Sequence, residues 1–145
     1  MLDQPNEPDA PKPALLLDND LFFSVKVTDT LKHAGYATRT VRRASDFARA
    51  LDDDVPPPAV ALVNTAARGI DWRAGIAAAV ARGIPVIAFG SHVDLDTQEE
   101  ARRLGATRVI ANSKLASDLP GVGARTLRRP RESGMENGPE RASGP

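Results

Sequence analysis

The sequence predicts an α/β fold, in which helices cover both faces of a parallel β-sheet. Two observations favour this fold. Short apolar runs alternate with amphipathic segments along the chain, and glycines recur where the amphipathic segments would end. Because parallel strands need crossover connections, and these are right-handed, a strict β-α alternation favours a doubly wound parallel sheet.

Length and composition predict one globular domain with tails. The chain has 145 residues, 41% of them hydrophobic, which is enough apolar surface for one core. Met1–Pro13 is rich in proline and acidic residues, and Gly121–Pro145 has few large apolar side chains. Neither end can bury enough surface to offset its ordering entropy. We therefore expect a disordered tail over 1–13, a domain over 14–120 and a flexible tail over 121–145.

Charge and cysteine content disfavour several functional classes. The chain has 19 basic and 19 acidic residues, so no global field attracts nucleic acid or an anionic membrane. It has no cysteine, which removes disulfides, thiolate nucleophiles and cysteine-based metal sites. No basic start precedes an apolar run, and no apolar stretch is long enough to cross a bilayer. We therefore predict a soluble cytoplasmic protein that does not bind membranes.

The first predicted strand is Ala14–Leu17, an apolar run of the kind that is buried on both faces of a sheet. It ends at the polar cluster Asp18-Asn19-Asp20 and so delivers polar residues to the C-terminal edge of the sheet. A helix is expected next, because apolar side chains then recur three or four residues apart and Gly35 stands where a left-handed cap is wanted. The apolar stripe consists of Phe23, Val27, Leu31 and Ala34.

The remaining elements continue the alternation. Ser45 and Asp71 are expected to cap the second and third helices, and Gly83 and Gly105 to end the third and fourth. The later predicted strands are Tyr36–Val41, Val60–Val63, Ile84–Phe89 and Arg108–Ala111. The later predicted helices are Ser45–Leu51, an alanine-rich helix after Asp71 through Ala81, Thr97–Leu104, and a broken segment over Lys114–Leu127.

The joint spacing of these features resembles the receiver domain of two-component response regulators over roughly Ala14–Leu115. The features are the polar cluster after the first strand, Gly35-Tyr36, Asn64 at the end of the third strand, Gly69-Ile70-Asp71, Ile84-Pro85-Val86-Ile87 and Gly105-Ala106. The resemblance implies a flavodoxin-like (CheY-like) five-stranded sheet in the order 2-1-3-4-5, with its site at the C-terminal strand edge.

The resemblance also implies a phosphorylation pocket, in which a working receiver needs an aspartate to attack phosphorus, carboxylates for Mg²⁺, a lysine and a hydroxyl. The acceptor position falls on Asn64, whose neutral amide cannot form an acyl phosphate. The hydroxyl position falls on Gly90, with Ser91 one place later. The lysine position falls on Asn112, with Lys114 two residues on.

The carboxylate cluster departs from the family pattern as well. Its middle residue is the amide Asn19, which leaves Asp18 and Asp20 as weak metal candidates. These losses in one pocket predict a pseudo-receiver with no catalytic residue, no phosphoryl transfer, no cofactor and no expected metal. Asp18 and Asp20 would then serve as caps of the first helix, and Asn64 would satisfy backbone groups in a turn.

Receiver families commonly dimerise or dock through the fourth helix, fifth strand and fifth helix. In this sequence that face covers Thr97–Leu104, Val109–Ala111 and Lys114–Leu119. We expect a phosphorylation-independent interaction module of bacterial signalling or stress regulation, with another signalling protein or a second copy as its partner. The candidate contact residues are Gln98, Glu99, Arg102, Arg103, Val109, Ile110 and Lys114.

An alternative function is binding of a small anion or metabolite in the degenerate pocket. The polar groups available for it are Asn19, Asn64, Ser91 and Asn112. An enzymatic function has less support, because the triad-like residues Ser91, His92 and Asp94 are too close in sequence to meet as triad members do.

Two features outside the pocket suggest contacts. Nucleic acid is not an expected partner except through the arginines of the C-terminal tail, for which a solvated role is favoured. These are Arg125, Arg128, Arg129 and Arg131. Trp72, the single tryptophan, either anchors a partner from an exposed position or covers the first turn of its helix.

Overall fold

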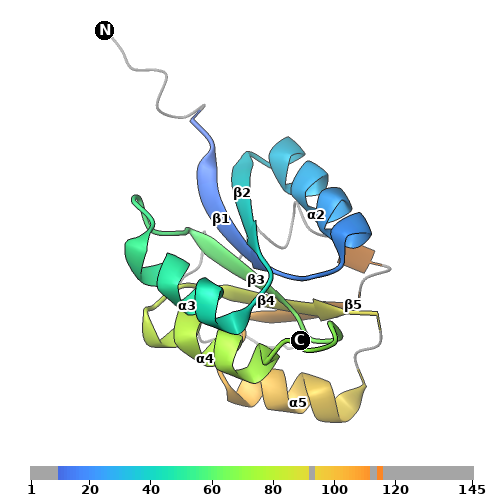
Figure 1. Cartoon of the computed structure of the whole chain (residues 1–145). Coiled ribbons are helices and arrows are strands. Elements are labelled where there is room, and N and C mark those ends of the chain that lie inside the picture. Colours follow the sequence, from blue (N-terminus) through green and yellow to red (C-terminus); the bar gives the residue numbers. More distant parts are fainter. Residues whose placement is uncertain (1–9, 92–93, 112–113, 116–145) are drawn as a thin grey trace, which may run out of the picture.

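The computed structural model describes residues 10–91, 94–111 and 114–115, which form a five-stranded parallel sheet with helices on both faces (Figure 1). The strand order is β2-β1-β3-β4-β5. The predicted fold class and strand order are therefore confirmed. The elements are β1 (Lys12–Leu17), α2 (Leu21–His33), β2 (Tyr36–Val41), α3 (Ala44–Asp53), β3 (Val60–Asn64), α4 (Trp72–Ala81), β4 (Val86–Gly90), α5 (Leu95–Arg103) and β5 (Arg108–Ala111).

Two hydrophobic cores lie on opposite faces of the sheet, because successive side chains of a strand point to opposite faces. In β1, Leu15 and Leu17 enter the core beneath α3 and α4, while Ala14 and Leu16 enter the core beneath α2. The other core residues divide in the same way, so α2 covers one face and α3, α4 and α5 cover the other (Figure 1).

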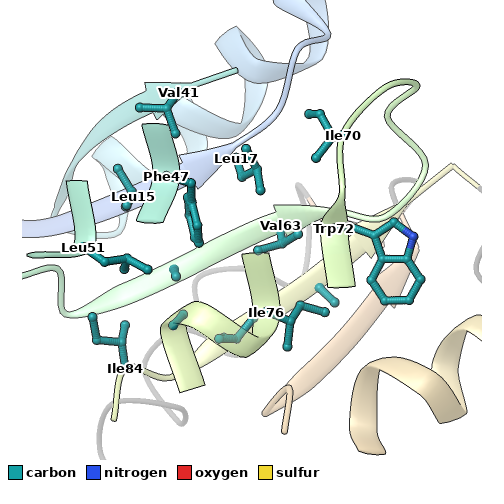
Figure 2. Close-up of a cluster of buried hydrophobic side chains, with 14 of the residues drawn as sticks. Leu15, Leu17, Val41, Phe47, Leu51, Val63, Ile70, Trp72, Ile76 and Ile84 are labelled. Carbon is teal, nitrogen blue, oxygen red and sulfur yellow. The ribbon is translucent and has the colours of Figure 1, made fainter. Parts of the chain in front are cut away.

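The larger core, beneath α3 and α4, depends on a close approach of α4 to the sheet (Figure 2). Phe47 of α3 and Ile76 of α4 are fully buried in it. Gly75 allows the approach, because a Cβ atom at this position would lie 2.7 Å from Leu17 Cδ2. Trp72 belongs to the same core and is 9% exposed, which agrees with a packing role and not with an exposed anchor.

Several predicted boundaries are confirmed by the backbone. β2 and β5 have the predicted bounds. Asp71 caps α4 by accepting a hydrogen bond from Ala74 N at 3.1 Å. Gly35 and Gly83 follow α2 and α4 with φ of 94° and 73°, the left-handed conformation that ends a helix.

The predicted cap at Ser45 is wrong. Helix α3 begins one residue earlier, at Ala44, and its N-cap is Arg43, which makes no side-chain capping hydrogen bond. Ser45 therefore lies in the first turn. The start of α5 is also earlier than predicted, at Leu95, because Asp94 caps the helix by accepting a hydrogen bond from Thr97 N at 2.8 Å.

Two strand starts differ from the prediction because of backbone hydrogen bonds. β1 begins at Lys12, whose N–H donates to Gly35 O at 2.9 Å and extends the pairing with β2. β4 begins at Val86, because Ile84 N donates back to Ala79 O of α4 at 3.0 Å.

The fifth predicted helix falls largely outside the described residues. Lys114 and Leu115 are helical, and Leu115 is buried in the core beneath α2. The rest of the segment, the tail predicted over 121–145 and residues 1–9 are not described. In the described part of the chain, no helix combines the length and apolar character needed to cross a membrane.

Candidate functional site

The centre of the candidate site is a hydrogen bond between the ends of two neighbouring strands. Asp18 follows β1 and Asn64 ends β3, and the pairing of these strands brings the two side chains together. Asn64 Nδ2 donates to Asp18 Oδ1 at 2.9 Å. Asp18 is 1% exposed and Asn64 is 4% exposed. The predicted acceptor position is therefore a buried amide paired with a carboxyl group.

The partners of Asn64 fix the orientation of its amide. On its other side, Asn64 Oδ1 accepts a hydrogen bond from Ala66 N at 2.8 Å. A backbone N–H can only donate and a carboxylate can only accept, so the amide nitrogen must face Asp18. Both ends of the amide are thus engaged, including the turn contact predicted for Asn64.

Asp18 is held in place but only half satisfied. Its Oδ1 also accepts from Asp20 N at 3.0 Å, whereas its Oδ2 is buried and has no hydrogen-bond partner within the described residues. Burial raises the pKa of Asp18, opposed by the hydrogen bonds from Asp20 N and from Asn64. The folded protein therefore binds the proton of the Asp18 carboxyl group more tightly than the unfolded chain does. The raised pKa of Asp18 therefore adds to the stability of the folded protein. This contribution is complete below the pKa of Asp18 in the unfolded chain and is lost as the pH rises through its pKa in the folded protein.

The other two residues of the polar cluster, Asp20 and Asn19, form hydrogen bonds that fix the start of α2 and the loop before it. Asp20 caps α2, since its Oδ1 accepts from Phe23 N at 2.9 Å, which agrees with the predicted capping role. Asp18 does not cap the helix but fixes the backbone of Asp20. Asn19 Nδ2 donates to Arg68 O at 2.7 Å and so ties this loop to the one after β3.

Mg²⁺ takes a near-octahedral shell of oxygens, and two side chains of this cluster are engaged in ways that do not favour such a site. The Nδ2 group of Asn64 points an N–H at Asp18 where a ligand oxygen would be needed, and Asp20 Oδ1 is committed to the helix cap. Asp18 Oδ2 is the buried oxygen of this cluster that has no hydrogen-bond partner within the described residues. In the described part of the chain, no three acidic, histidine or cysteine residues lie close enough to hold a metal.

The sequence did not predict the role of the hydroxyl of Thr65, which directly follows Asn64 at the end of β3. Thr65 Oγ1 donates to Phe89 O at 3.2 Å. A Cβ atom at Gly90 would lie 2.8 Å from this oxygen, so a side chain at Gly90 would need Thr65 to move. The space that a hydroxyl residue at Gly90 would use is therefore taken by Thr65. The one sequence signal was that a hydroxyl residue directly follows Asn64.

The other predicted pocket residues are not assembled around this pair in the described residues. Ser91 is exposed after β4, and Asn112 and His92 lie outside the described residues. Asp94 serves as the cap of α5. The amides of Asn19 and Asn64 are already engaged with protein groups, so nothing observed favours the small-anion function, which stays a prediction.

The predicted interaction face is divided by the sheet. Val109 packs against the core beneath α3 and α4, whereas Ile110 packs against the core beneath α2, so these neighbours do not share a face. On α5, Glu99, Arg102 and Arg103 are exposed. Of the other predicted contact residues, Gln98 is half-buried and Lys114 is exposed.

A small network of charges rigidifies the same helix. Glu100 of α5 forms ion pairs with Arg103 and with Arg73 of α4, the latter at 3.4 Å. The hydrogen bond from Arg103, followed by the charges of Arg103 and Arg73, lowers the pKa of Glu100. Glu99 and Arg102 take no part in this network, so their charges face solvent.

Comparison with solved structures places this geometry in a known fold. A CheY-like receiver domain protein of Methanospirillum hungatei superposes with a TM-score of 0.74 at 17% identity, over 86% of this chain and 100% of that chain. The receiver domain of NtrX from Brucella abortus gives 0.71 at 23% identity, over 80% and 98%. The receiver domain of the Pseudomonas aeruginosa sensor histidine kinase PA1611, which has a magnesium ion in its active-site cleft, gives 0.72 at 16% identity, over 82% and 99%.

The chain therefore has the fold of response-regulator receiver domains, as its sequence resemblance predicted. It spans 28% of a longer NtrX chain from Brucella abortus. No protein-family model and no curated protein sequence matches the chain.

Proposed function

We propose that this chain is a pseudo-receiver, a non-enzymatic signalling module that acts through protein contacts and independently of phosphorylation. The observation that supports this function most is the bond from Asn64 Nδ2 to Asp18 Oδ1. A carboxamide has no anionic oxygen to attack phosphorus, and the amide nitrogen is directed at a carboxyl group. Asn64, at the acceptor position, thus stabilises the fold and does not take part in phosphoryl transfer.

Two further observations support loss of the phosphorylation switch. A Cβ atom at Gly90 would lie 2.8 Å from Thr65 Oγ1, so the family's hydroxyl residue would fit at that point only if Thr65 moved. The predicted lysine position, Asn112, cannot supply a cation to neutralise a phosphoryl group. Without acceptor, hydroxyl and lysine, the module would present one constitutive surface to its partner.

We place the contact surface on α5, whose exposed charges are arranged to select a partner. Replacing Glu99 with arginine and Arg102 with glutamate reverses two exposed charges that lie outside the ion pairs of Glu100, without changing the net charge. We expect this variant to weaken self-association or partner capture about tenfold, because charges opposite the partner's groups would become repulsive. Sedimentation velocity measures the first and a pull-down with the immobilised domain the second.

A matched control reverses a charge pair elsewhere. Asp52 of α3 and Arg82 at the end of α4 form two hydrogen bonds of 2.6 and 2.9 Å, and exchanging them keeps the pair and the net charge. This exchange should leave association unchanged. Acetyl phosphate and Mg²⁺ should also leave wild-type association unchanged, and a clear response to them would contradict phosphorylation independence.

A further inference from the structure

The outer edge of β2 is an open backbone surface. β2 is the first strand in the sheet order, and within the described residues only β1 pairs with it. Lys12 N and Asp18 N donate to Gly35 O and Val41 O, which turns the odd-numbered residues of β2 toward β1. Because backbone groups alternate in a parallel ladder, the N–H and C=O groups of Tyr36, Thr38 and Thr40 face outward.

A basic groove of about 490 Å³ runs beside this edge on the α3 side. Arg49 pairs with Asp46 at 3.2 Å, and Arg39 pairs with Asp54. Asp53 also lines the groove. Arg42 and Arg43 have no ion-pair partner among the described residues. The arginines that line it are Arg39, Arg42, Arg43 and Arg49, of which Arg42 and Arg43 are the unpaired ones.

A second groove of about 360 Å³ lies on the other side of the same edge, against α2. Thr40 lines both grooves, so they flank one strand. The second groove contains Val25, which is 67% exposed, the hydroxyl residues Ser24 and Thr28, and the oppositely charged Asp29 and Lys32. Its two charges are opposite in sign, so this groove carries no excess charge, in contrast to the arginines on the first side.

We infer that β2 binds an extended segment of a partner protein in which acidic and apolar residues alternate, and that this segment adds to the sheet as a sixth strand. Its backbone pairs with the outward groups of Tyr36, Thr38 and Thr40. Because side chains of a strand alternate between faces, every second residue meets the arginine groove and the others meet the groove beside Val25. Acidic residues match the unpaired cations Arg42 and Arg43.

The charges favour an acidic partner over a second copy of this chain. Edge strands are commonly protected from self-pairing by charged side chains. An antiparallel pair of β2 strands would bring the arginine grooves of both copies to the same face, and like charges across a strand pair are destabilising. This surface lies on the edge of the sheet opposite β5, so it goes beyond the contact proposed for α5 and does not depend on the state of Asn64.

The test uses the full chain and a short, end-blocked, fluorescent peptide of alternating glutamate and valine, with binding measured by anisotropy. We expect binding that weakens about tenfold or more when Arg42 and Arg43 are both replaced by glutamate. The same change at Arg68 and Arg108, two exposed arginines outside β2, α3 and α5, is the matched control and should leave the affinity unchanged. Absence of binding to the wild type, or equal losses in both variants, would overturn the proposal.

Hydrogen exchange followed by NMR tests the strand pairing directly and requires no variant. Bound peptide should slow exchange about tenfold at the amides of Thr38 and Thr40, while those of Ala37 and Arg39, which face β1, should change little. A peptide of the same composition with its glutamates in one block should bind more weakly. Strand addition would be overturned if the block peptide bound equally well or if a single-stranded oligothymidylate bound more tightly. It would also be overturned if the amides of Ala37 and Arg39 were protected as much as those of Thr38 and Thr40. Each of these results would indicate general charge attraction.

Discussion

Replacing Asn64 with aspartate is expected to destabilise the protein by about 3 kcal/mol at pH 7, because a buried donor becomes a second buried acceptor. In the wild type, Asn64 Nδ2 donates to Asp18 Oδ1 at 2.9 Å. The substitution would place two carboxyl oxygens at this distance, with little solvent to screen them. Urea denaturation of both proteins gives the difference in the free energy of unfolding.

The loss should depend on pH in a defined direction. Both carboxyl groups titrate near pH 3.9 when unfolded, and the folded pair raises its pKa by sharing a proton. The deficit should therefore be smallest below about pH 4 and grow as the pH rises through the folded pKa. Asp18→Asn alone is the control, because an amide oxygen can still accept from both Asn64 Nδ2 and Asp20 N and no second carboxyl group is created. Equal stability of Asn64→Asp and wild type at pH 7 would contradict the role assigned to the amide.

Replacing Phe47 with alanine is expected to cost about 3–5 kcal/mol, because it removes a fully buried ring from the core beneath α3 and α4. The core around this ring is closely packed: a Cβ atom added at Gly75 would lie 2.7 Å from Leu17 Cδ2. The ring itself lies between α3 and the sheet (Figure 2). Urea denaturation and thermal melting measure the effect.

Phe22 provides a control with the same side chain. It is 75% exposed on α2, and its ring lies 5.2 Å from Lys26 Nζ. Phe22→Ala should change the free energy of unfolding by no more than about 1 kcal/mol, the value of an exposed cation–π contact. Similar losses at Phe22 and Phe47 would contradict the assignment of the core.

The fold could be predicted from the sequence because its signals are local and repeated. The buried run Ala14–Leu17 and the cap at Asp71 each specify a short segment, and the alternation of such segments specifies a parallel sheet. Boundaries set by long-range hydrogen bonds could not be predicted in this way. β1, for example, extends to Lys12 because Gly35 accepts its N–H.

The candidate site could be predicted in position but not in detail. The place of Asn64 at the end of β3 follows from one apolar run, and the structure has it there. That Asn64 donates to Asp18, and that Thr65 fills the space beside Gly90, depends on how separate strands pair. The roles predicted for these residues stay predictions.

The arginine groove was missed for a related reason. Sequence patterning singled out the arginines of the C-terminal tail, because they lie close together in sequence. The groove instead gathers Arg39 from β2, Arg42 and Arg43 from the loop after it and Arg49 from α3, which are spread over a longer stretch of sequence. Only the packing of α3 beside the edge strand reveals them as one surface.

Intact-mass spectrometry after incubation with acetyl phosphate and Mg²⁺ tests phosphorylation independence most directly. Wild type and Asn64→Asp are compared with and without the phosphoryl donor, and thermal melting with Mg²⁺ is recorded for both. The proposed function requires that wild type gain no phosphoryl group and show no stabilisation by Mg²⁺. A phosphoryl adduct on wild type would contradict it and show that a working acceptor survives elsewhere in the chain.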